Sequence, residues 1–366
     1  MNAKAIERYM QKSGGIVDDK PLFSNIREKV IEKKVLTKDY GKTENGDVSA
    51  KEADTPSDLK VPTYLMNFPF TLEVGDANNI WMKKLPPAKR KLDYEKAFTQ
   101  FLSLYNFIAS NAVVYLLPSS YEKQDLPYVA NLGAYLPHIK DKETIILAKM
   151  KSPPRQGEEP IGALFFKMMK YRVIQPPLYF EGEAELKYLN DNNYVMGYGQ
   201  RTDKELAIWL KNNFAMNVIP VEETDPYCYH LDCSIFPITK EKAIVCTELM
   251  KPQEIKAIEK YTEIIPVDKE MGRSGITNSV RCRNMILCAS SINEHKENTD
   301  DYKRERDKVE FLNQVCADEG LEAVIFNLSE FEKSGAALSC LCMNLSFCDL
   351  QKGTSQQENT KNGNRN

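Results

Sequence analysis

The sequence contains one cysteine whose surroundings suit chemistry on a small substrate. Cys340 lies in FEKSGAALSCLCMNL, where the small residues 335–337 would let the backbone approach a ligand closely. A thiol in such a turn can be accessible, and a nearby imidazole can lower its pKa. Cys342 shares the predicted strand that follows, and an inert place in the core is the alternative interpretation for either cysteine. The pattern therefore indicates a candidate nucleophile.

Imidazole chemistry has few candidates, because the sequence contains only three histidines. His230 lies in DPYCYHLDCSIFPI, and we predict that it shares one face of an apolar strand with Asp232. A partly buried structural histidine with a local carboxylate partner is the alternative. His138, in AYLPHIK, and His295, in the charged segment NEHKEN, are expected in turns or at the surface. His230 is therefore the candidate acid or base.

Acidic and basic side chains add to these candidates. Glu181, in PPLYFEGEAELKYL, is predicted on a strand where an unpaired carboxylate would be costly, so it could pair with an imidazole. Its spacing with Glu183 and Glu185 leaves the alternative that one of the three faces a solvated edge. Arg155, in KMKSPPRQGEE, and Arg201, in GYGQRTD, could grip a carboxylate through two hydrogen bonds, although surface positions are the alternative for both.

Composition excludes several classes of protein. Lys and Arg number 49 against 52 Asp and Glu, so net charge gives no general attraction to nucleic acid. No apolar run approaches a membrane span and the first residues are polar, which predicts a cytoplasmic location without a membrane partner. The nine cysteines form no CxxC pair and are expected to be reduced thiols. Without finger-like His and Cys spacing, we expect no metal and no cofactor.

The elements that must position these residues occupy the middle of the chain. Residues 1–60 are predicted to be peripheral, with an amphipathic helix over 21–36 and a flexible linker over 38–60. Residues 351–366 contain no apolar side chain and are expected to be disordered. The folded domain is therefore predicted to cover 61–350.

Strand-like and helical segments alternate within this domain. Short apolar runs begin roughly 40–60 residues apart, and a second strand-like segment follows each. The apolar runs are 112–117, 173–176, 217–221, 263–267 and 322–328. Helices are predicted over 92–110, 203–214 (with a capping box at Thr202 and Glu205), 252–261 and 300–319. This alternation predicts an α/β fold, and five similar units suggest a ring, with an open sheet as the alternative.

The order of the segments resembles the guanidino-group-modifying superfamily. This superfamily includes dimethylarginine dimethylaminohydrolases, arginine deiminases, arginine dihydrolases and amidinotransferases, and the match is strongest to the eukaryotic-type dimethylarginine dimethylaminohydrolase branch. FEGEAEL stands where the superfamily has an FEGGD-like segment, HLDCSIFPI where it has H-x-D before an apolar run, and SGAALSCLCMNL where a small-residue turn precedes its cysteine. DLPYVANLGAYL, PPRQGEE and GYGQRT are also similar. The likeness spans about residues 61–350.

The resemblance implies the pentein fold, a five-bladed pseudosymmetric α/β propeller with its active site in the central channel. It implies that Cys340 is the nucleophile, His230 the general acid and base, and Glu181 the partner of His230. The implied substrate-binding residues are Asp125, Asn131, Asp232, Arg155 and Arg201. Asp232 would hold the guanidinium, Asp125 and Asn131 would line the same end, and the two arginines would face a substrate carboxylate.

The activity implied is hydrolysis of the guanidino group of arginine or a related guanidine through a covalent thiouronium intermediate. Asn131 stands where deiminases carry an aspartate. The arginine-dihydrolase branch also carries asparagine at this position, and this resemblance implies arginine as substrate and ornithine as product. The sequence departs from the family where FEGGD has become FEGEAE, which affects the second acidic position. An amidinotransferase with the same triad, or a binding protein of pentein fold without activity, remains as an alternative.

Overall fold

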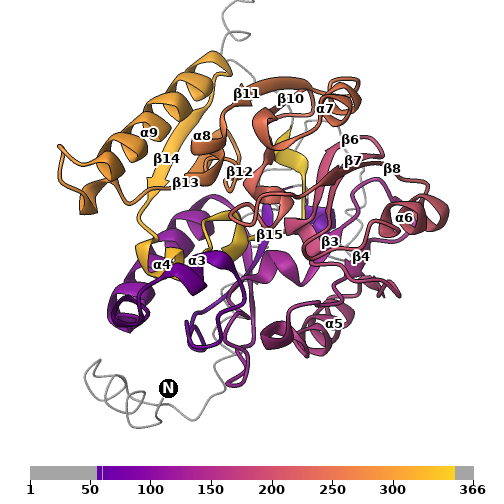
Figure 1. Ribbon diagram of the computed structural model, residues 1–366. Helices are drawn as coiled ribbons and strands as arrows, with labels where there is room; N and C mark the ends of the chain where they lie inside the picture. Colours follow the sequence, from indigo (N-terminus) through magenta and orange to yellow (C-terminus); the bar gives the residue numbers. More distant parts are fainter. Residues whose placement is uncertain (1–55, 60, 351–366) are drawn as a thin grey trace, which may run out of the picture. The chain divides into compact units, whose positions relative to one another are not determined.

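The computed structural model describes residues 56–59 and 61–350, and these form five three-stranded sheets (Figure 1). The strand orders are β15-β1-β2, β3-β4-β5, β6-β7-β8, β9-β10-β11 and β12-β13-β14. In each sheet the first strand of the order pairs antiparallel with the middle strand, and the middle strand pairs parallel with the last. We call these the inner, middle and outer strands. The repeated order confirms the predicted α/β fold of five similar units.

The strands are short, with two to six residues each. Their bounds are β1 Thr63–Asn67, β2 Val113–Leu117, β3 Gly133–Tyr135, β4 Thr144–Leu147, β5 Arg172–Ile174, β6 Leu186–Asn190, β7 Asn193–Tyr198, β8 Asn217–Glu222, β9 Ile235–Pro237, β10 Lys242–Cys246, β11 Glu263–Val267, β12 Val280–Cys282, β13 Met285–Ala289, β14 Glu322–Phe326 and β15 Met343–Asn344. The five apolar runs singled out in the sequence correspond to the outer strands β2, β5, β8, β11 and β14.

A helix connects the middle strand of each sheet to its outer strand, because parallel neighbours need a crossover. These helices are α4 Tyr94–Asn111, α5 Glu159–Met168, α6 Leu206–Phe214, α7 Pro252–Ile258 and α9 Asp300–Asp318. In Figure 1 they lie at the periphery of the five sheets, whereas β15 lies near the centre. The shorter helices are α3 Ile80–Lys84, α8 Lys269–Arg273 and α10 Ser329–Glu332.

The helix α4 illustrates why these segments fold as they do. Asp93 caps its N-terminus by accepting a hydrogen bond from the backbone N–H of Lys96. Phe101, Leu104 and Ile108 recur at helical spacing and are all buried in one hydrophobic cluster with strand residues. The periodic apolar face therefore fixes the helix against its sheet.

The start of α6 differs from the prediction. The helix begins at Leu206, and its N-cap Glu205 makes no side-chain capping bond, so the capping box predicted at Thr202 and Glu205 is wrong. The carboxylate of Asp203 instead accepts a hydrogen bond from the backbone N–H of Tyr179 at 2.9 Å. The side chain of Asp203, which the local pattern assigned to the helix, thus makes a tertiary contact instead.

Strand β15 joins the two ends of the described domain. It pairs antiparallel with β1, in register Tyr64 to Asn344. The predicted helix over 21–36 and the predicted tail over 351–366 lie outside the described residues. From the predicted linker, Pro56–Leu59 is described and forms a 3-10 turn, and the Ser57 hydroxyl lies 2.7 Å from the hydroxyl of Tyr171.

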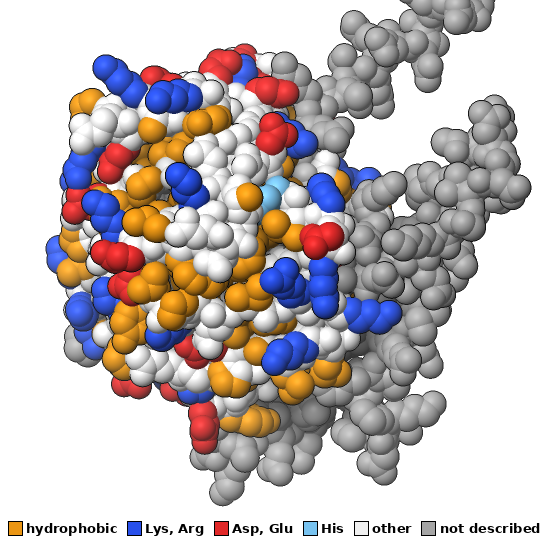
Figure 2. Space-filling model, turned by 90° about the vertical axis from the view of Figure 1, so that its right-hand side faces the viewer, with side chains coloured by type: hydrophobic (Ala, Val, Ile, Leu, Met, Phe, Trp, Pro, Cys, Tyr) orange, Lys and Arg blue, Asp and Glu red, His pale blue; other side chains and the backbone are white. Residues whose placement is uncertain are grey.

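Among the described residues, the face in view in Figure 2 carries side chains of both charges, with several Lys and Arg side chains close together toward its right. In Figure 2, Lys and Arg side chains are interspersed with acidic and hydrophobic ones. Within the described part of the chain, no helix combines the length and apolarity needed to cross a membrane.

Candidate active site

Short 3-10 turns precede four of the five inner strands and position the candidate residues. They are η3 (Val129–Asn131), η5 (Gly182–Ala184), η6 (Leu231–Cys233) and η9 (Ser339–Leu341). In each sheet the strand begins two residues after the turn ends. The internal repeat therefore brings side chains from distant parts of the sequence to one end of the inner strands.

The backbone at these positions corrects one prediction. His230 and Asp232 were expected on one face of a strand, but β9 begins only at Ile235. His230 is an extended residue before η6, and Asp232 lies within that turn. Glu181 likewise precedes η5 and is not in a strand. An extended residue followed by a tight turn can show the same alternation of polar and apolar residues as a strand, so the sequence pattern does not distinguish the two.

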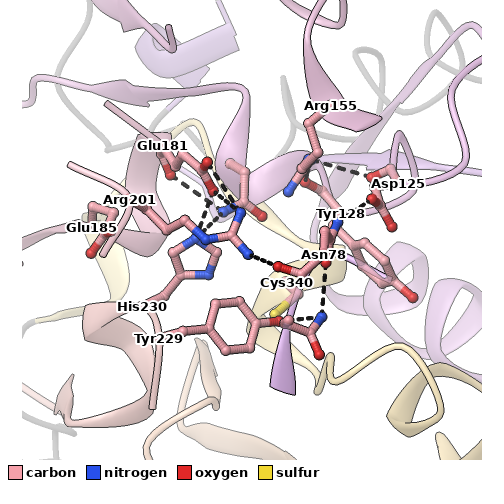
Figure 3. Close-up of polar contacts among 12 residues, drawn as sticks. Asn78, Asp125, Tyr128, Arg155, Glu181, Glu185, Arg201, Tyr229, His230 and Cys340 are labelled. Carbon is pink, nitrogen blue, oxygen red and sulfur yellow. Dashed lines mark hydrogen bonds and ion pairs between the residues drawn. The ribbon is translucent and has the colours of Figure 1, made fainter. Parts of the chain in front are cut away.

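His230 and Glu181 form a buried pair, as the resemblance implied (Figure 3). The imidazole Nε2 lies 2.8 Å from the Glu181 carboxylate, and the exposed fractions are 5% and 0%. Burial would raise the pKa of Glu181, but the hydrogen bond to His230 and the charges of Arg201 and Arg155 lower it to about 2. Glu181 is therefore an anion that can orient the imidazole and stabilise its protonated form.

Cys340 and His230 line the same small cavity, about 20 Å³ in volume. That space is enough for roughly one water molecule. The cavity is lined by Asn78, Asn79, Asp125, Tyr128, Asn131, Arg155, Arg201, Tyr229, His230, Ser334, Ala336 and Cys340. The Cys340 side chain is 7% exposed, and burial together with the nearby Asp232 carboxylate raises its pKa to about 12. The thiol is therefore protonated at neutral pH.

Asp232 lies behind the thiol and is almost fully buried. Its Oδ2 atom accepts a hydrogen bond from the Ser339 hydroxyl at 2.8 Å and lies 3.9 Å from Cys340 Sγ. Asp125 accepts a hydrogen bond from Asn78 Nδ2 at 2.6 Å, and burial raises the pKa of its carboxyl group. Two carboxyl groups thus stand near the thiol or line its cavity.

Asn131 connects the cavity to the His230–Glu181 pair. Its Nδ2 atom lies 3.3 Å from His230 Nε2 and 3.4 Å from the backbone oxygen of Glu181. The side chain is 2% exposed and belongs to η3, which packs against both η5 and η9. Its amide can both donate and accept hydrogen bonds at this position.

The two candidate arginines line the cavity but are engaged with groups of the protein. Arg155 pairs with Glu158, with 2.7 Å between Nη2 and Oε2, and also donates to the backbone oxygen of Tyr128 at 3.0 Å. Arg201 lies 3.3 Å from Glu181 Oε1 and donates to the backbone oxygen of Asn78 at 2.8 Å.

The other glutamates of FEGEAEL are buried, so the alternative that one of them faces a solvated edge is wrong. Glu183 accepts a hydrogen bond from the backbone N–H of Asn344 at 2.7 Å. Glu185 accepts one from the backbone N–H of Leu231 at 3.2 Å, which holds the turn carrying Asp232. Glu185 also faces Glu223, and burial together with their mutual repulsion raises the pKa of Glu223 well above its ordinary value.

The remaining histidines and the second cysteine lie elsewhere. His138 bridges the Tyr194 hydroxyl, at 2.7 Å, and the backbone oxygen of Phe214, at 2.9 Å. His295 is partly exposed near the N-terminal end of α9. Cys342 is fully buried in the hydrophobic core and does not line the cavity. In the described part of the chain, no group of three or more His, Cys, Asp or Glu could hold a metal ion.

Several cavity residues were missed by sequence reasoning. Asn78 contacts Asp125 and Arg201, and the neighbouring Asn79 caps α3 through the N–H of Met82. A signal existed for Asn79, since asparagine before a helix is a common N-cap. Asn278 does not line this cavity, but it contacts Cys340 and was also missed, although it precedes β12 by the same offset by which Asn131 precedes β3.

Comparisons with known proteins agree with this fold. A family model described as N,N dimethylarginine dimethylhydrolase, eukaryotic, matches residues 67–345. An uncharacterised protein of Caenorhabditis elegans is 24% identical over 258 residues, which cover 69% of this chain and 85% of the relative. The bifunctional arginine dihydrolase/ornithine cyclodeaminase AgrE of a Nostoc species is 23% identical over 286 residues, covering 76% of this chain and 37% of AgrE.

A solved structure gives the same result for the fold. The N-terminal domain of ArgZ, an arginine dihydrolase from cyanobacteria, matches with a TM-score of 0.67 and 22% identity, covering 78% of this chain and 98% of that domain. The chain spans just over a third of its bifunctional relative AgrE. These findings define a pentein-type member of a family of guanidino-group hydrolases. Within that class, the chain belongs to the eukaryotic N,N dimethylarginine dimethylhydrolase family, whose model covers most of it.

Proposed function

We propose that the protein hydrolyses the guanidino group of arginine or a closely related guanidine, with Cys340 as the nucleophile. The observation that carries this proposal is the convergence of a thiol and a His–Glu pair on one cavity. Cys340 and His230 line the cavity, while Glu181 holds the imidazole at 2.8 Å from behind. Nucleophile, base and orienting carboxylate are the parts that covalent catalysis at a guanidinium carbon requires.

The charges suggest how the thiol is activated. In the free protein its pKa of about 12 keeps it neutral. A cationic guanidinium held by Asp232 beside the sulfur would lower that pKa, because an opposite charge favours the thiolate. Activation of the thiol would therefore depend on the substrate. Until a guanidine is bound, the thiol would remain neutral and unreactive.

The reaction then proceeds in two halves. His230 accepts the thiol proton while Sγ attacks the guanidinium carbon, and it returns the proton to the departing amine as the carbon–nitrogen bond breaks. The thiouronium so formed is attacked by water, which gives up a proton to the neutral imidazole, and the carbon–sulfur bond breaks to restore the thiol. Glu181, with its pKa near 2, remains an anion throughout and stabilises the imidazolium.

Substrate recognition in this proposal uses the other cavity residues. Arg155 and Arg201 would bind the carboxylate of an amino-acid substrate, and Asp125 and Asn131 would line the guanidino end. Because Asn131 is neutral and its amide can donate to a carbonyl oxygen, a ureido product could stay bound after the first ammonia has left. Sγ would then attack its carbon, a second ammonia would leave, water would cleave the carbon–sulfur bond, and the resulting carbamate would lose carbon dioxide to give ornithine. We therefore infer a preference for unmethylated arginine and release of ornithine, which is the arginine-dihydrolase type of reaction.

Product analysis by mass tests the proposal directly. Purified protein is incubated with arginine, methylarginines and agmatine, and the same panel is run with Cys340→Ser and with Cys342→Ser as the matched control. We expect ornithine from arginine with wild type and Cys342→Ser, and a loss of several orders of magnitude with Cys340→Ser. Turnover that survives in Cys340→Ser contradicts the nucleophile, while turnover only when an acceptor amine is added would favour an amidinotransferase.

A further inference from the structure

Asn278 stands beside the proposed nucleophile on a segment that has no part in the mechanism above. It is 3% exposed and lies two residues before β12. Its Nδ2 atom is 3.5 Å from Cys340 Sγ, and its Oδ1 atom accepts a hydrogen bond from the backbone N–H of Ser339 at 2.9 Å. The side chain therefore touches both the reacting sulfur and the turn that carries it.

The orientation of this amide follows from its partners. The backbone N–H of Ser339 can only donate, so it must face the oxygen of the Asn278 amide. The opposite end of the amide, the NH2 group, is then directed at the sulfur. A neutral thiol can donate to Oδ1, which lies 3.7 Å from Sγ, whereas a thiolate can only accept. Nδ2 is a side-chain donor within reach, beside the backbone of Ala337, which also lowers the pKa of the thiol.

The surroundings of the sulfur make such a donor useful. Asp232 also lies near Cys340 Sγ, and its carboxylate opposes a negative charge on the sulfur more strongly than Lys187 favours it. A fixed positive side chain would stabilise the thiolate but would also repel a cationic substrate. A neutral amide donor stabilises the thiolate without occupying or repelling the guanidinium.

We propose that Asn278 is a catalytic residue that donates a hydrogen bond from Nδ2 to the thiolate of Cys340. The inference deepens the proposed function, because it assigns the donor that stabilises the sulfur when it attacks and again when it leaves the thiouronium. The thiol proton still passes to His230, and Asn278 neither gains nor loses a proton. The hydrogen bond also lowers the pKa of the thiol against burial and Asp232, which raise it.

Two substitutions separate a donor from a structural support. Asn278→Asp keeps the oxygen that accepts from Ser339 but replaces the donor with an anionic oxygen, while Asn278→Ala removes both bonds. The rate of alkylation of Cys340 by iodoacetamide at fixed pH reports its thiolate fraction, which falls tenfold for each unit by which the pKa rises. Fragmentation of the alkylated peptide assigns the label to Cys340, because Cys342 and Cys348 lie on the same tryptic peptide.

A donor role predicts that Asn278→Asp lowers the alkylation rate by about tenfold or more, and more than Asn278→Ala does. Turnover should then fall through kcat with little change in KM. A merely structural role predicts the reverse order, with Asn278→Asp resembling wild type. Equal alkylation of wild type and Asn278→Asp, with folding verified by thermal denaturation, overturns the inference. Alkylation needs no turnover, so failure of the hydrolase proposal would appear separately, as a wild type that labels but does not hydrolyse.

Discussion

Replacing Glu181 by glutamine removes the charge that His230 and Arg201 share. The carboxyl is fully buried, and its pKa is about 2 against an ordinary value of 4.5. The difference is about 2.5 units, which corresponds to roughly 3 kcal/mol in favour of the anion. Glu181→Gln keeps the size of the side chain but loses this stabilisation. We expect it to cost up to about 3 kcal/mol of unfolding free energy at neutral pH.

The activity of Glu181→Gln should fall further than its stability alone suggests. The amide cannot stabilise an imidazolium as the carboxylate does, and it can hold the wrong tautomer of His230. Loss of an orienting carboxylate typically costs up to about 10⁴ in kcat. We expect kcat/KM for arginine to fall by about 10³–10⁴, measured on protein that remains folded at the assay temperature.

The pH dependence gives the sign of the effect. Because folding lowers the pKa of Glu181, its stabilisation is complete above the unfolded value of 4.5 and disappears as the pH falls toward 2. Denaturant unfolding of wild type and Glu181→Gln should therefore differ by a constant amount near neutral pH, and the difference should shrink below about 4.5.

Glu223→Gln is the matched control. Burial and the neighbouring Glu185 raise the pKa of Glu223 well above its ordinary value, which favours the neutral carboxyl group. Because Gln matches a neutral carboxyl group in size, the substitution should cost less unfolding free energy than Glu181→Gln does and leave turnover unaltered. Near wild-type turnover in Glu181→Gln, or a stability difference that grows in acid, would refute the assigned role of the His230–Glu181 pair.

Three further predictions concern His230, Asn131 and the terminal segments of the chain. His230→Ala should lower turnover by orders of magnitude, and any residual kcat/KM should lose the pH dependence of wild type; a folded variant with wild-type turnover would contradict its role as acid and base. Asn131→Asp should shift the product from ornithine toward citrulline, as mass analysis of the products would detect; ornithine from both proteins would contradict the role given to the amide. Deleting residues 1–40 and 353–366 should leave activity unchanged, and loss of solubility would show that they belong to the folded domain.

Much of the α/β architecture follows from local signals. Each outer strand was visible as an apolar run, and the helix between it and the middle strand was visible as an amphipathic segment in four of the five sheets. Glu263–Val267 coincides with β11, and residues 300–319 end within one residue of α9. When one face of an element is buried, apolar residues recur along the sequence with the period of that element, which is why these elements were predictable.

The turns before the inner strands were less visible. The two-residue strand β15 and the 3-10 turns η5 and η6 carry no periodicity of their own, so Glu181 and His230 were assigned to strands. Asn278 was overlooked because an asparagine before a strand is also an ordinary turn residue. Its meaning depends on the sulfur 3.5 Å away, which belongs to a residue 62 positions later in the chain.

By itself, the sequence determined the α/β class, the five repeated units and the small set of thiol, imidazole and carboxylate groups available for chemistry. Only the tertiary structure decided which of these groups meet. Cys340 and Cys342 illustrate the difference: both are buried in the same hydrophobic cluster two residues apart, and of the two only Cys340 also lines the cavity with His230. Local periodicity records which face of an element is buried, whereas the site depends on contacts between turns of different sheets, and no short segment of sequence encodes those contacts.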